Sequence, residues 1–136
     1  MHIQLHDNIT LKEIKNIFSD HYPYLKLEFF SKPHLLYESS NECDVLPDDK
    51  MLKEIKDIHI DGVINILPTE KVADLEFEFQ RRFGLPVQVL HKEQGQWHQT
   101  TGMDAFTLHD VNQYSKNDSD EDLIEEYEDG FDELKA

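Results

Sequence analysis

The run from Glu70 to Gly102 carries two hydrophobic periods in succession. Between residues 70 and 83 the apolar side chains recur every three or four positions, which predicts a helix with one apolar face. From residue 87 to 92 apolar and polar residues alternate, which is the period of a strand. Gly95 marks a tight turn, and a second strand is predicted at 97–101. This part of the chain therefore predicts helix, strand, turn and strand.

The same order of patterns occurs earlier in the chain. Residues 2–6 alternate as a short strand, and residues 24–31 alternate as a longer one. Between them, Thr10 and Glu13 have the spacing of a capping box, in which hydroxyl and carboxylate satisfy the first N–H groups of a helix. A short helix after Pro47 and an apolar strand near 63–67 connect the two copies.

Two β-α-β units in succession predict an α+β fold, namely a ferredoxin-like β-α-β-(α)-β-α-β sandwich with an extra C-terminal hairpin strand. The helices would cover one face of an antiparallel sheet and leave the other face open. A short helix is expected from residue 108 to about 114. We predict one α+β domain over residues 1–116 and an acidic tail, helical or disordered, over residues 117–136.

A resemblance covers about a third of the chain. The segment FGLPVQVLHKEQGQWHQTTGMDAFTLHDVN, residues 83–112, is similar to a segment of small, uncharacterised bacterial proteins. It rests on Phe83-Gly84-Leu85, Gly95, Trp97, Gln99-Thr100-Thr101 and Thr107-Leu108. The resemblance implies a bacterial domain that spans the whole chain. It implies no activity and transfers no catalytic residue.

The net charge of −16 restricts the partners. Residues 117–136 carry ten carboxylates and one lysine, and the rest of the chain is acidic as well. Such a field repels phosphate, so we expect neither nucleic acid nor an anionic membrane as a partner, whereas a basic protein is compatible. The N-terminus has no signal-peptide pattern and no apolar run is long enough for a bilayer, so a cytoplasmic location is predicted.

The sequence gives little support for a metal or cofactor site. Cys43 is the only cysteine, which excludes an internal disulfide and a multi-cysteine metal site. His91 and His98 flank the hairpin turn, but no HExxH motif or helical histidine pair is present. Residues 118–129 imitate the start of a calcium loop, yet Leu123 and Asp129 stand where glycine and glutamate are needed. We predict no metal and no cofactor.

Two segments have the character of binding sites. Trp97 and Gln99 share a strand face, and tryptophan is common at interface hot spots, although Trp97 could instead cover the core. In the tail, apolar residues fall on one side of a helix with carboxylates opposite, a pattern suited to docking in an apolar groove. The tail positions are Leu123 or Ile124, Tyr127, Phe131 and Leu134.

These features predict a non-enzymatic protein-binding or adaptor module. Its sheet face or edge strand 97–101 would pair with a partner or a second copy, and the acidic tail would add a second contact. The alternative is a small-molecule or metal-binding domain, a cryptic enzyme, that uses His91, Trp97, His98 and Gln99. An acidic mimic of nucleic acid fits less well, since the carboxylates concentrate in the tail. No phosphate-binding loop or nucleophile elbow supports catalysis.

Overall fold

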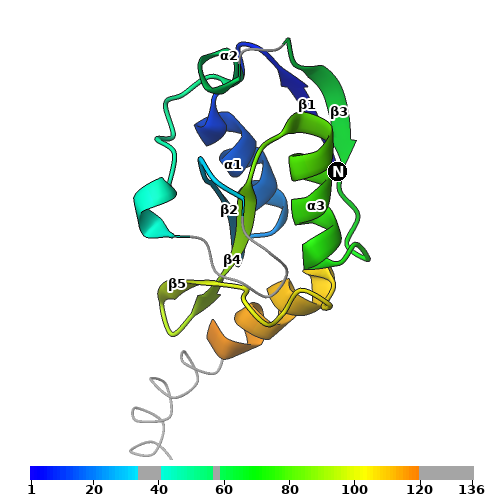
Figure 1. Cartoon of the computed structure of the whole chain (residues 1–136). Coiled ribbons are helices and arrows are strands. Elements are labelled where there is room, and N and C mark those ends of the chain that lie inside the picture. The colour runs from blue at the N-terminus through cyan, green and yellow to red at the C-terminus, as the bar shows by residue number, and fades with distance from the viewer. Residues whose placement is uncertain (34–40, 57–58, 120–136) are drawn as a thin grey trace, which may run out of the picture.

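The computed structural model describes residues 1–33, 41–56 and 59–119 and confirms an α+β fold (Figure 1). The predicted tail contacts Tyr127, Phe131 and Leu134 lie outside the described residues. The elements of the described part, in chain order, are β1 (His2–His6), α1 (Leu11–His21), β2 (Leu25–Phe29), the 3₁₀ helix η1 (Glu42–Asp44), α2 (Leu52–Ile55), β3 (Asp61–Asn65), α3 (Val72–Phe83), β4 (Val87–Glu93), β5 (Gln96–Gln99) and a helical segment at 108–119.

The strands of the described part form two antiparallel sheets, β1–β3 and β2–β4–β5. Each pair joins corresponding strands of the two β-α-β units, with Ile3 opposite Ile64 and Leu27 opposite Val89. The structure does not confirm the predicted ferredoxin-like topology, because the two strands of each unit lie in different sheets. The extra hairpin contributes to this result: β4 bonds β2 on one edge and β5 on the other, so no edge of β4 is left for β1.

The core is built from the apolar faces that the periodicity predicts. Leu11, Ile14 and Phe18 of α1 are fully buried, as are Val72, Leu75 and Phe79 of α3. Phe79 meets Phe29 of β2 edge to face, with ring centroids 5.7 Å apart. Such aromatic contacts stabilise a core by more than the burial of their apolar area alone provides. Both sheets, α1, α3 and the 108–119 helix therefore share one core.

Local signals place the helix ends. Thr10 Oγ1 accepts a hydrogen bond from the backbone N–H of Glu13 at 3.2 Å, which confirms the predicted cap of α1. Gly84 ends α3 with φ 62° and ψ 28°, a left-handed conformation that glycine adopts without a Cβ penalty. Both interactions lie within four residues of the helix end, so the sequence pattern alone predicts them.

The helix predicted from residue 108 to 114 extends to 119, beyond the predicted domain boundary at 116. Its inner face buries Leu108, Val111 and Ser115. Asn112 Oδ1 accepts from the backbone N–H of Tyr24 at 3.1 Å, which ties this helix to the residue before β2. Among the described residues, no helix combines the length and apolar character needed to cross a membrane.

Candidate functional site

The predicted hairpin residues are divided between two faces of the β2–β4–β5 sheet. His91 pairs with His98 across the hairpin, and Lys92 pairs with Trp97. Because side chains alternate along a strand, the two histidines lie on one face, and Trp97 and Gln99 lie on the other. The imidazole centroids of His91 and His98 are 6.1 Å apart. The structure thus brings the histidines together and separates them from Trp97 and Gln99.

His91 is buried under the 108–119 helix. Its Nδ1 lies 3.2 Å from Ser115 Oγ, and its Nε2 lies 3.9 Å from a carboxylate oxygen of Glu93. Burial lowers the pKa of His91, because the charged imidazolium is poorly solvated there. Within the described residues, no three histidine, cysteine, aspartate or glutamate side chains gather as a metal-binding group. The arrangement joins helix to sheet.

Trp97 lies on the opposite face with 38% of its surface exposed. Lys26 Nζ of β2 is 5.2 Å from the centre of its ring, within range of a cation–π contact. The same ammonium is 3.9 Å from the carboxylate of Glu28. Trp97 therefore packs against a lysine across the sheet and keeps part of its ring available.

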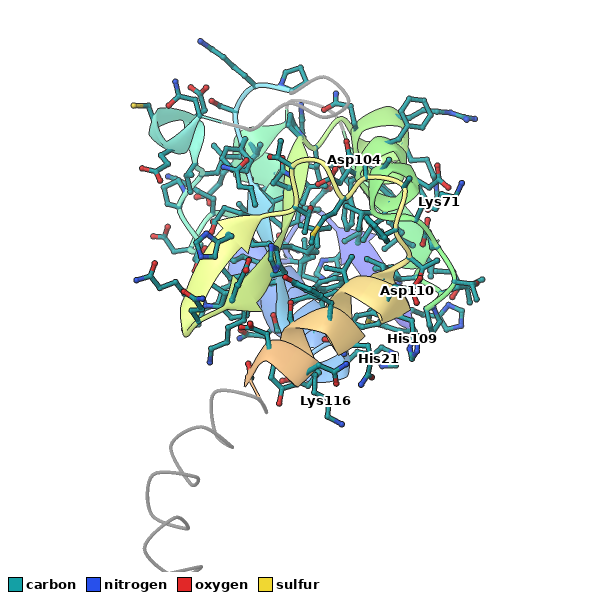
Figure 2. All side chains as sticks on the ribbon, turned by 90° about the horizontal axis from the view of Figure 1, so that it is seen from below. His21, Lys71, Asp104, His109, Asp110 and Lys116 are labelled. Atoms are coloured by element: carbon teal, nitrogen blue, oxygen red, sulfur yellow. The ribbon has the colours of Figure 1, made fainter. Side chains whose placement is uncertain are left out.

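A second constellation, which we call the acidic cavity, lies between α3 and the start of β4. It has a volume of about 140 Å³ and is lined by Pro33, Ala73, Glu76, Phe77, Gln80, Pro86, Val87 and Asp104. Glu76 and Gln80 are one turn apart on α3, so their side chains share a face. Asp104 is brought there by its own main chain, since the N–H of Ala73 donates to its carbonyl at 3.0 Å. Figure 2 shows Asp104 in the loop beside α3, near Lys71.

The two carboxyl groups of the acidic cavity are both buried, with 6% of Glu76 and 2% of Asp104 exposed. Glu76 Oε2 accepts from the backbone N–H of Val89 at 2.8 Å. Burial raises the pKa of Glu76 to about 8, and the nearby charge of Asp104 adds to the rise. A carboxyl group with a strongly raised pKa beside a cavity, as Glu76 has, is a recognised mark of functional sites.

The same cavity combines a polar end with apolar walls. Gln80 Oε1 is buried and has no hydrogen-bond partner among the described residues. Phe77 lines the cavity while 61% of its surface is exposed, so it joins the cavity wall to the molecular surface. The cavity thus contains the amide oxygen of Gln80, and an aromatic ring lies where it meets the surface.

The sequence prediction did not include Glu76, Gln80 or Asp104. A signal was present for Glu76, because it follows Leu75 within the apolar stripe of α3, at a position where a leucine or valine is usual. A carboxylate on a buried stripe predicts a buried charge in need of a partner. No comparable local signal marks Asp104, which reaches the cavity through the tertiary path of its loop.

A third feature, which we call the apolar groove, lies between the 108–119 helix and the loop before it. It has a volume of about 310 Å³ and is lined by Met103, Phe106, Asp110, Val111 and Tyr114. Phe106 and Tyr114 are 53% and 48% exposed. Figure 2 shows this helix in front, with Asp110 near its start and Lys116 near its end. The sequence prediction included the helix but not the groove beside it.

Comparison of the chain with family models, with curated proteins and with solved structures finds no match. The resemblance of residues 83–112 to a bacterial family therefore stays a prediction.

Proposed function

We propose that the protein is a non-enzymatic binding module that holds a basic, amphipathic segment of another protein in the apolar groove. The observation that supports this proposal is the pair of exposed aromatic residues, Phe106 and Tyr114, that line one groove. Aromatic side chains supply most of the energy at many interfaces, because they bury large areas at low entropic cost.

The charge of the protein favours a basic partner. The chain carries a net charge of −16, and Asp110 is one of the residues that line the groove itself. Complementary charge steers encounter and rejects acidic competitors, while the apolar contacts provide the affinity. The same charge speaks against nucleic acid and anionic membranes as partners.

The hairpin and the tail fit the proposal as secondary contacts. Among the described residues β5 is the outer strand of its sheet, and an outer strand is the usual place for pairing with another strand or a second copy. The acidic tail follows the 108–119 helix along the chain and would add attraction for a basic segment. An exposed Cys43 thiol is compatible with a reducing compartment, and residues 83–112 resemble a bacterial family, so we propose that the protein acts in the cytoplasm of a bacterium.

The test uses the full chain and two synthetic probes, an amphipathic Lys/Leu peptide and a Glu/Leu peptide of the same length. We expect fluorescence anisotropy to show binding of the Lys/Leu peptide, and the interaction to weaken at high salt. Replacing Phe106→Ser or Tyr114→Ser should weaken it about tenfold, the effect of losing roughly 1.4 kcal/mol at a hot spot.

The matched control is Val63→Ser, which removes a side chain of similar exposure (47%) from β3, outside the groove. This variant should bind the Lys/Leu peptide like the unmodified protein. Equal binding of the two peptides, or an equal loss in all three variants, would show that the groove is not the site.

A further inference from the structure

We infer that His91 is a pH-sensitive switch: its protonation in mild acid releases residues 112–119, the second half of the 108–119 helix, from the β4–β5 hairpin. The release is a property of the chain itself and needs no partner. The inference rests on the position of one titratable side chain between a strand and a helix, with only 3% of its surface exposed.

His91 makes two contacts with the part of the helix that we expect to move. Its Nδ1 lies 3.2 Å from Oγ of Ser115, which is fully buried. The ring of Tyr114 also lies beside the imidazole, with the two ring centroids 6.2 Å apart. The charge of His91 therefore acts directly on the packing of residues 112–119.

A proton on this imidazole is poorly compensated by its surroundings. The charged groups that face it are Glu93 and His98 from the hairpin and Asp118 from the helix, and its neighbour on β2 is Leu25. The nearest Glu93 oxygen is 3.9 Å from Nε2, which is too far for a hydrogen bond. Asp118 Oδ2 accepts instead from the backbone N–H in the hairpin turn, at 2.9 Å. Neither carboxylate therefore serves as a close partner for the imidazolium.

The pairing of His91 with His98 adds to the cost of charge at this position. The two imidazole centroids are 6.1 Å apart, and positive charges on both rings repel each other. Burial lowers the pKa of His91 from its ordinary value of 6.5, and His98 lowers it further. Glu93 and Asp118 offset only part of this decrease. The packed helix thus favours the neutral ring.

The direction of the switch follows from linkage. Release of residues 112–119 exposes the imidazole to water, where its pKa returns to the ordinary value. The released state then binds a proton more readily than the packed state, so its population rises as pH falls below 6.5. Between pH 8 and pH 5 the rise is at most about thirtyfold, the limit for a ring that is protonated only after release.

The consequence for the apolar groove rests on the proposed function. Tyr114 lines this groove and belongs to the segment that is released. If the groove holds a basic amphipathic segment at neutral pH, mild acid removes one of its two aromatic contacts. The bound segment would then dissociate more readily in acid.

The competing explanation is that His91 is only a buried hydrogen-bond partner for Ser115. A glutamine side chain can also bond to a hydroxyl, but it does not titrate. A general effect of acid on the fold is distinguishable as well, because it has the opposite sign. The pKa of Glu76 is raised to about 8, which makes the whole fold more stable at pH 5 than at pH 8.

The test is amide hydrogen exchange of the full chain at pH 7 and pH 5, read by NMR as protection factors, which correct for the intrinsic exchange rate. We expect protection of residues 112–119 to fall about tenfold at pH 5, while protection of α1 does not fall. His91→Gln should abolish this difference. The matched control His109→Gln removes an exposed histidine at the start of the same helix and should retain it (Figure 2).

A second measurement does not depend on any variant. NMR titration of the imidazole resonances in the unmodified protein should show that His91 is protonated below pH 6.5. Circular dichroism at pH 7 establishes that both variants are folded. The inference would be overturned by a His91 midpoint at or above 6.5, by an equal loss of protection in the His91→Gln variant, or by a loss that includes α1.

Fluorescence anisotropy of the Lys/Leu peptide at pH 7 and pH 5 tests the consequence for the groove. Binding should weaken at pH 5 in the unmodified protein and in the His109→Gln variant, but not in the His91→Gln variant. Hydrogen exchange is measured without peptide, so the two failures are distinguishable. No binding at pH 7 refutes the proposed function and leaves the switch intact, whereas unchanged protection at pH 5 refutes the switch alone.

Discussion

At the scale of single residues, some of the buried polar side chains join two elements. His91 of β4 meets Ser115 of the 108–119 helix, and Glu76 of α3 meets the backbone of β4. A buried polar atom that loses its partner costs more than the hydrogen bond itself provides, because water cannot replace the partner. Each of these contacts therefore specifies how its two elements pack.

The contact between His91 and Ser115 yields the first prediction. Ser115→Ala leaves His91 Nδ1 without this partner in a site where both residues are buried. We expect a loss of about 1–3 kcal/mol in the free energy of unfolding, measured by urea denaturation. Hydrogen exchange should accelerate in residues 108–119 more than in α1. Gln113→Ala, an exposed position on the same helix, should change stability by less than about 0.5 kcal/mol.

At the scale of elements, the hairpin between β4 and β5 contains backbone in an unfavourable conformation. Gln94 and Gly95 form its two-residue loop, and both have positive φ, at 51° and 76°. Positive φ at both central residues is the pattern of a type I′ turn, in which Asn-Gly is preferred. Gln94 is the only non-glycine residue of the described part with positive φ, so it bears the conformational cost.

Replacing Gln94→Asn should therefore stabilise the protein by about 0.5 kcal/mol, because asparagine tolerates the left-handed conformation better than glutamine. The backbone N–H of residue 94 still donates to Asp118 in the variant. Thermal unfolding of the full chain measures the change. Gly95→Ala provides the opposite case and should destabilise, although open space surrounds the position, since the penalty comes from φ alone. Stabilisation in both variants, or in neither, would refute this account of the turn.

The elements also show which parts of the fold the sequence could predict. The cap at Thr10, the end of α3 at Gly84 and the cap at Thr107 depend on neighbours within four residues, and all three are found. Sheet pairing depends instead on strands separated by about sixty residues, and no local pattern distinguishes β1 from β2 as the partner of β4. The sequence pattern therefore does not predict the two-sheet arrangement. It does not predict the position of Asp104 either, because that position depends on the path of its loop in the folded chain.

At the scale of the whole molecule, the protein has a net negative charge and two concave surfaces of different chemistry. The apolar groove is lined by exposed aromatic rings, whereas the acidic cavity is lined by two buried carboxyl groups and an amide. The two sites share the segment between Thr100 and Leu108, which contains Met103 and Phe106 of the groove and Asp104 of the cavity.

The buried carboxyl groups make the stability of the whole fold depend on pH. The pKa of Glu76 rises from an ordinary value near 4.5 to about 8 on folding, so the folded state holds a proton that the unfolded state releases. Where the folded state binds more protons, stability falls as pH rises. The free energy of unfolding should therefore decrease from about pH 5 to pH 8 and then level off. Glu70, whose pKa burial and Glu78 raise to about 7, acts in the same direction.

Glu76→Gln isolates the contribution of the cavity, because Glu70 is present in both proteins. The amide oxygen of glutamine can still accept from Val89, so the variant keeps the structural hydrogen bond without the titrating group. We expect the free energy of unfolding of the variant, relative to that of the unmodified protein, to rise by on the order of 1 kcal/mol for each pH unit between 5 and 8. Urea denaturation measures both free energies. Glu13→Gln, at an exposed position of α1, should show no such trend. A difference between the Glu76→Gln variant and the unmodified protein that stays constant with pH would mean that Glu76 is ionised in the folded state, and that a positive partner already neutralises it.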